Sequence, residues 1–231
     1  MSNIIKCLLS AGIIVAGTTA AFSHGDVKPQ AVDTTGLPEN GEEWRTENPY
    51  RAEAVGEEIW RKAITIGASG YNQNCARCHG LQAVSGGLAP DLRFLEAEEY
   101  GDEWYVERFR EGYTQNGITK MPAFGELLGQ DAAWAIRTYI ETRPDEDAME
   151  AASDELKGIR DTLVGYQTDA SGVDHEPIKA RLIEIASGIE AASGAPVADS
   201  IALRAAALLD GTPAAYKSAA ETLTIGLSAA N

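Results

Sequence analysis

The sequence predicts an all-α protein in which a helical domain is followed by an appended Ala-rich helical segment. Apolar residues recur at helical spacing in both parts, strands and helices do not alternate, and prolines mark the starts of the later helices. With 231 residues, 44% of them hydrophobic and 23% charged, the chain is long enough for one or two globular domains with a substantial core.

The chain is strongly acidic, with 35 Asp and Glu residues against 19 Lys and Arg and a formal net charge of −16. It has no basic block, so nucleic acid is excluded as a partner. The acidic surface either steers a partner that presents positive charge or serves only solubility, and the sequence leaves these two alternatives open.

Residues 1–23 are predicted to be a secretory signal peptide. Lys6 is followed by an apolar run that is short for a bilayer of ~30 Å, and Ala21-Phe22-Ser23 places small residues before a cleavage point at His24. An uncleaved anchor is the alternative. Export of this kind predicts a periplasmic protein without stable membrane insertion.

The rest of the chain divides into three predicted segments. Residues 24–55 form an irregular segment, residues 56–143 form the helical domain, and residues 144–231 form the helical extension.

The motif Cys75-Ala76-Arg77-Cys78-His79 has the C-x-x-C-H spacing of covalent c-type haem attachment. On a helix, residues i and i+3 share one edge, so both thiols reach the two vinyl groups of one porphyrin, and His79 follows as an axial ligand. A redox disulfide or half of a zinc site are the alternatives, but a zinc site lacks a second ligand pair and a thioredoxin-like site lacks its βαβ context. One such motif predicts one haem c.

The second axial ligand is expected to be Met121. Pro122 lacks an N–H and restricts Met121 to an extended backbone, which suits a loop that presents a thioether to a metal. Met149, His175 and an open coordination site remain the alternatives. His/Met ligation is typical of electron carriers, whereas an open site would indicate an enzyme or a gas sensor.

Two further helices complete the predicted domain. One spans 102–112, with Trp104 and Phe109 pointing inward; the other spans 131–140, with Asp131 as its N-cap. In the second helix the apolar face and core aromatics are Ala133, Trp134, Ile136, Tyr139 and Ile140. Arg93 is expected either to pair with a haem propionate or to be exposed.

The extension contains no Trp, Phe or Cys, and 20 of its 88 residues are Ala. Its segments begin near Pro144, Pro177, Pro196 and Pro213, and Thr212 is a suitable N-cap for the last of them. Apolar stripes at helical spacing are formed by Leu156, Ile159 and Leu163 and by Leu182, Ile185 and Ile189. Three or four amphipathic helices are therefore expected, with a partly disordered tail as an alternative.

Several stretches resemble the periplasmic cytochrome c-550 family, whose members accept electrons from pyrroloquinoline-quinone-dependent ethanol dehydrogenases. The resemblance spans about residues 24–143 and is carried by the haem motif and, more specifically, by WRTENPYR at 44–51 and SGGLAPDLR at 85–93. It implies a class I cytochrome c domain in which helix 67–75 crosses helix 131–140 at Gly67.

The resemblance also implies the roles of individual residues. Cys75 and Cys78 bind the haem, His79 and Met121 are the axial ligands, and the carbonyl of Pro90 accepts a hydrogen bond from His79. The implied partners are a quinoprotein alcohol dehydrogenase and a downstream cytochrome or oxidase, and the protein is expected to be a carrier, not an enzyme. A general periplasmic carrier to a terminal oxidase or reductase is the alternative.

The exposed haem edge is the expected docking surface, and the extension is either a packing module or a device that positions the carrier on its dehydrogenase. The residues expected at the docking surface are Gln73, Ala76, Leu81 and Ala83.

Overall fold

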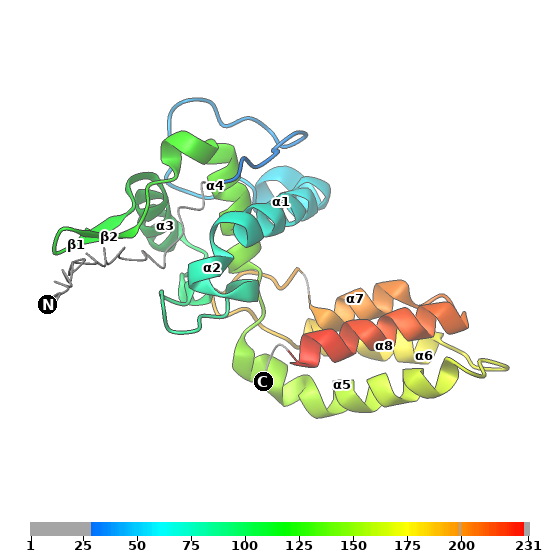
Figure 1. The fold of residues 1–231 in the computed structure, drawn as a ribbon. Helices are drawn as coiled ribbons and strands as arrows, with labels where there is room; N and C mark the ends of the chain where they lie inside the picture. The colour runs from blue at the N-terminus through cyan, green and yellow to red at the C-terminus, as the bar shows by residue number, and fades with distance from the viewer. Residues whose placement is uncertain (1–28, 199, 229–231) are drawn as a thin grey trace, which may run out of the picture.

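The computed structural model describes residues 29–198 and 200–228, so the predicted signal peptide and His24 lie outside the described residues. The described chain is predominantly helical, which confirms the all-α prediction. Figure 1 shows two groups of helices, one built from residues before 144 and the other from the four helices of the extension.

The first group contains helices α1 (Ala52–Asn74), α2 (Ala76–His79), α3 (Glu99–Glu111) and α4 (Gly125–Glu141). Two short 3-10 turns, η1 (Leu81–Ala83) and η2 (Leu92–Phe94), lie between α2 and α3. Long helices α1 and α4 are each interrupted near their start by a glycine with positive φ, Gly56 and Gly129.

Helices α1 and α4 cross where Gly67 lies. A Cβ on Gly67 would collide with the carbonyl oxygen of Ala135 and crowd the Cβ of Tyr139. The absent side chain therefore allows the two backbones to touch, as the resemblance implied, and the aromatic rings of Tyr71 and Tyr139 pack beside this crossing with centroids 5.3 Å apart.

A two-stranded antiparallel hairpin joins α3 to α4. Strands β1 (Tyr113–Gln115) and β2 (Ile118–Met121) are connected by Asn116 and Gly117, both with positive φ. Asn-Gly between two strands is the sequence signal of a tight hairpin turn. Met121 consequently lies at the end of a strand and not in the loop that its proline neighbour suggested.

The irregular segment before α1 is fixed to the helices by buried polar contacts. Asn48 donates from its side-chain amide to Thr138 and Glu141, and its backbone N–H donates to Asp102. Arg51 forms ion pairs with Asp102 and Glu141 at 2.8 and 2.9 Å. The WRTENPYR stretch therefore ties the segment before α1 to α3 and α4.

Two expectations for the helices are corrected by the structure. Helix α4 begins before Asp131, whose carboxylate accepts hydrogen bonds from the backbone and side chain of Asn40, so Asp131 holds the N-terminal segment instead of capping a helix. Trp104 is half-buried, and the inward positions of α3 are Tyr105 and Phe109 because they lie one turn apart on the core-facing side.

The extension folds into helices α5 (Glu146–Tyr166), α6 (Glu176–Ser187), α7 (Ile201–Leu208) and α8 (Pro213–Ser228). Helices α5 and α8 run antiparallel side by side (Figure 1). Thr212 accepts a hydrogen bond from the backbone N–H of Ala215, as expected of an N-cap. Leu156, Leu163 and Leu182 are fully buried in a core separate from that of the first group.

Candidate haem site

The haem motif lies on α2, directly after α1. Cys75 ends α1, its N–H donating to the Tyr71 carbonyl, and the N–H groups of Cys78 and His79 both donate to the Cys75 carbonyl. This single helical turn puts the two thiols on one edge of the helix. Both cysteines are free of disulfides, and Cys78 is exposed while Cys75 is half-buried.

Burial, followed by the neighbouring Cys78 thiol, raises the pKa of Cys75 to about 12. Redox-active C-x-x-C cysteines have a lowered pKa that keeps them as nucleophilic thiolates. Burial shifts the pKa of the Cys75 thiol in the opposite direction, which argues against a thioredoxin-like role for the motif.

The His79 ring is oriented by the loop that follows it. Nδ1 of His79 lies 2.9 Å from the carbonyl oxygen of Pro90. A carbonyl only accepts, so this contact selects the tautomer with its proton on Nδ1 and leaves the Nε2 lone pair available for a metal.

Residues Gly80–Arg93, here termed the proximal loop, make polar contacts with α1 and with one another. Tyr71 donates from its hydroxyl to the carbonyl of Gly80 at 2.8 Å. Asp91 accepts hydrogen bonds from the backbone N–H groups of Ser85 and Arg93 and from the Arg93 guanidinium. Burial alone would raise the pKa of Asp91, but these hydrogen bonds outweigh it and lower that pKa.

Arg93 is buried and paired with Asp91 and Glu146, so the expectation of an exposed Arg93 is wrong. The sequence could not reveal this arrangement, because Glu146 lies 53 residues further along the chain in the extension.

Met121 and its sequence alternatives occupy different surroundings. Met121, at the end of β2, and Cys75, in the haem motif, both pack against the core of the first group. Met149 is buried in the core of the extension, and His175 precedes α6, where its Nε2 lies 3.1 Å from Glu176. Of these three side chains, only Met121 shares a core with the haem motif.

Two observations show that the site fits a haem. Trp134 is fully buried, and its indole N–H has no hydrogen-bond partner among the described residues, a state that costs about 1–3 kcal/mol unless a further group accepts the bond. A haem propionate is such an acceptor. Large apolar side chains also stand exposed on the proximal loop after His79, on the strand of Met121 and at the start of α4, namely Leu81, Leu88, Ile118 and Leu127.

Comparison with known proteins agrees with this chemistry. A family profile described as cytochrome c oxidase, cbb3-type, subunit III matches residues 62–140. Cytochrome c550 of Pseudomonas aeruginosa is 49% identical over 144 residues, which cover 61% of this chain and 94% of that protein. The chain belongs to the cytochrome c550 family. Like its family, it is an electron-transfer protein with covalently bound haem c, and not an enzyme.

More distant relatives share shorter stretches with this member of the cytochrome c550 family. Cytochrome c6 of Euglena gracilis is 33% identical over 79 residues, or 33% of this chain and 88% of that protein. Quinohemoprotein alcohol dehydrogenase ADH IIB of Pseudomonas putida is 32% identical over 88 residues, which are 37% of this chain but only 12% of the dehydrogenase. No solved structure matches the chain.

The predicted docking residues differ in exposure. Gln73 and Leu81 are exposed and Ala76 is half-buried, but Ala83 is fully buried, so it cannot contribute to a docking surface. Its neighbour Gln82 is exposed in its place. No helix in the described ranges has the length and apolarity that a bilayer crossing requires.

Proposed function

We propose that this cytochrome is a periplasmic carrier that accepts single electrons from a quinoprotein alcohol dehydrogenase acting on ethanol. It passes these electrons to the respiratory chain through a downstream cytochrome or oxidase. Haem c supplies the one-electron couple when bound. The single observation that carries the proposal is the haem motif on α2 with His79 oriented by Pro90.

In this proposal Cys75 and Cys78 hold the haem as thioethers, and His79 and Met121 are the axial ligands. The Pro90 carbonyl fixes the tautomer and direction of the His79 ring, which raises its basicity as a ligand. With both axial positions filled by protein, the iron exchanges electrons without binding substrate.

The dehydrogenase partner is supported by the relative from Pseudomonas putida. That quinohemoprotein alcohol dehydrogenase carries a stretch similar to this chain within a much longer protein. A separate carrier of the same kind is the natural acceptor for a dehydrogenase of this class. Export by residues 1–23 would put the carrier in the periplasm.

The test is stopped-flow reduction of the oxidised, haem-loaded protein by a purified quinoprotein ethanol dehydrogenase plus ethanol, followed at the haem α-band. We expect fast, saturable reduction that requires the dehydrogenase. Slow reduction that does not saturate would refute this partnership and favour the general carrier.

A matched pair of variants locates the docking surface in the same assay. Leu81→Ser alters an apolar side chain, 72% exposed, two residues from His79, whereas Ile225→Ser alters one that is 69% exposed on α8 of the extension. We expect the first to lower the second-order rate constant about tenfold, as for the loss of one apolar anchor in a small interface, and the second to leave it unchanged.

A further inference from the structure

We propose that the helical extension braces the proximal loop, and that Glu146 is a positioning residue for His79. The inference rests on the ligation by His79 proposed above and goes beyond it by giving the extension a role. The contacts that carry it join the first turn of α5, and the residues just before it, to the loop that contains Pro90.

The proximal loop contains strained backbone. Gln82 and Ala83 are consecutive non-glycine residues with φ of 60° and 64°. Each left-handed residue of this kind costs about 1–2 kcal/mol, and such conformations persist only where the surrounding structure holds them. A loop with two of them next to an axial ligand needs support from outside itself.

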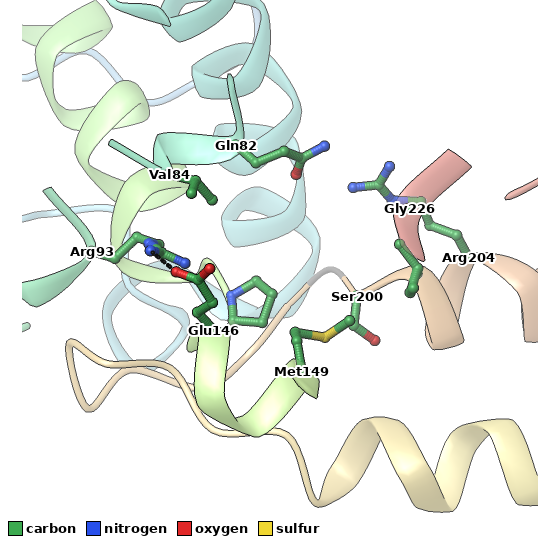
Figure 2. A pocket seen from close by; sticks show the side chains of 10 residues that line it. Gln82, Val84, Arg93, Glu146, Met149, Ser200, Arg204 and Gly226 are labelled. Atoms are coloured by element: carbon green, nitrogen blue, oxygen red, sulfur yellow. Dashed lines mark hydrogen bonds and ion pairs between the residues drawn. The ribbon is translucent and has the colours of Figure 1, made fainter. Parts of the chain in front are cut away.

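The first contact is an ion pair at the far end of the loop. The Arg93 guanidinium binds Asp91 at 2.7 Å and reaches Glu146 at 3.4 Å, and Figure 2 shows Glu146 directed at Arg93 from the start of α5. Arg93 is buried, so Asp91 and Glu146, whose side chain is 57% exposed, together balance a cation that is itself shielded from water. Asp91 directly follows Pro90, whose carbonyl faces His79.

The second contact is at the beginning of the loop. Nη1 of Arg143, three residues before α5, lies 3.4 Å from Oε1 of Gln82. The Arg143 guanidinium is itself fixed over the Tyr139 ring, 4.2 Å from its centroid, and donates to the Tyr139 carbonyl. The strained residue Gln82 is therefore held by the chain segment that leads into the extension.

A small cavity separates the loop from the rest of the extension. It measures about 80 Å³, and Figure 2 shows Gln82 and Arg204 pointing toward each other across it. Its loop wall consists of Gln82, Val84 and Arg93, and its extension wall of Pro144, Glu146, Met149, Ser200, Ile201, Arg204 and Gly226. Across this gap Glu146 pairs directly with Arg93, while Arg143, at the junction with the extension, holds Gln82.

Movement of this loop alters the hydrogen bond between Pro90 and His79. A weaker hydrogen bond makes the imidazole a poorer donor to iron, which disfavours the oxidised state and raises the reduction potential. Glu146→Gln removes one of the two carboxylates that pair with Arg93. We therefore expect it to weaken the hydrogen bond between Pro90 and His79 and to raise the reduction potential.

The experiment compares Glu146→Gln with Asp147→Asn in the full-length, haem-loaded protein. Both substitutions remove one negative charge from an exposed side chain in the first turn of α5, but Asp147 makes no ion pair with Arg93 in the described structure. The readouts are the midpoint potential and the hydrogen exchange of two backbone amides, those of Ser85 and Arg93, which both donate to Asp91.

We expect several-fold faster exchange of both amides and a positive shift in potential for Glu146→Gln. Asp147→Asn should leave the exchange unchanged and shift the potential less. Equal potential shifts with unchanged exchange in both variants would overturn the inference, since Glu146 would then act only as a surface charge. If the wild-type, haem-loaded protein does not use His79 as an axial ligand, the proposed ligation is refuted. The role of Glu146 in positioning His79 is then refuted as well.

Discussion

The buried ion pairs around Asp102 predict a graded loss of stability when their arginines are replaced by methionine. Arg137 is fully buried and binds Asp102 at 2.8 Å and the Glu96 carbonyl at 2.5 Å. Arg51 binds Asp102 and Glu141 with a side chain 22% exposed. Arg61 pairs with Glu57 at the surface, where both side chains are more than half exposed.

The magnitudes follow from these surroundings. Arg137→Met removes the buried cation that pairs with the Asp102 carboxylate, and the carbonyls of Leu95 and Glu96 lose a hydrogen-bond donor. The free energy of unfolding should therefore fall by about 3–5 kcal/mol. Arg51→Met leaves Asp102 paired with Arg137 and should lower it by about 1–3 kcal/mol. Arg61→Met is the matched control, and its expected effect is about 0–1 kcal/mol.

Urea unfolding at neutral pH measures these losses, with tryptophan fluorescence as the probe. All four tryptophans precede residue 144, so their fluorescence reports the first group of helices and not the extension. Equal losses in the three variants, or a larger loss for Arg61→Met than for Arg137→Met, would refute the reasoning that burial decides the contribution of these pairs.

The loss in free energy of unfolding caused by Arg51→Met should also depend on pH. Burial raises the pKa of Glu141 above 4.5, and Arg137 and Arg51 counteract that increase. When a carboxyl has a higher pKa in the folded protein than in the unfolded chain, the folded protein loses stability as the pH rises from the unfolded pKa through the folded pKa. Removing Arg51 raises the folded pKa further, so the deficit should be smaller near pH 4.5 than at neutral pH, and a deficit independent of pH would contradict this account.

Three further predictions concern the ligand, the loop and the helix crossing. Met121→Ala should open the haem iron to external ligands such as carbon monoxide, whose binding is seen in the absorption spectrum. Met149→Ala should leave that spectrum unchanged and lower the free energy of unfolding by about 2–5 kcal/mol. Carbon monoxide binding to both variants, or to neither, would contradict the assignment of Met121 as the ligand. Because the pKa of Asp91 is lowered from 3.8, its stabilising contribution is present above that pH and lost as the pH falls through the folded pKa, so Asp91→Asn should be less stable at neutral pH but not in strong acid. Gly67→Ala should lower stability by about 1–3 kcal/mol because its Cβ meets backbone, while Gly158→Ala, with open space inside α5, should raise it by about 0.5–1 kcal/mol in thermal unfolding.

The features that the sequence predicted well are those encoded in a few neighbouring residues. The haem motif, the helical stripes of the extension and the Thr212 cap each depend on spacing within one or two turns. The Asn116-Gly117 hairpin belongs to the same kind of signal, and reading it would have placed Met121 on a strand.

The features that sequence reasoning missed depend on tertiary pairing. Nothing local to Arg93 indicates that its partner Glu146 comes from another group of helices. Asp131 has the residue type and position of an N-cap, but Asn40 lies 91 residues earlier and takes its carboxylate. Local sequence patterns predict only the contacts that a residue makes with its neighbours in the chain. In the folded protein, a residue from a distant segment can take the place of those neighbours.

The position of these distant contacts explains how the extension can affect the haem domain although most of its apolar residues bury a core of their own. The four helices of the extension form that separate cluster, and Ala198, before α7, packs in the core of the first group. Two of the places where the two groups meet are polar: Glu146 pairs with Arg93 at the proximal loop, and near the end of α4 the Ser193 hydroxyl donates to the Glu141 carbonyl while the Ser193 carbonyl accepts from the N–H of Ala97. A change at these contacts therefore reaches the loop beside His79 and the Glu141 network, while the crossing of α1 and α4 at Gly67 is made by residues of the first group. On this basis substitutions of Glu146 or Ser193 should alter the surroundings of the haem more than substitutions inside the extension core, such as Met149→Ala.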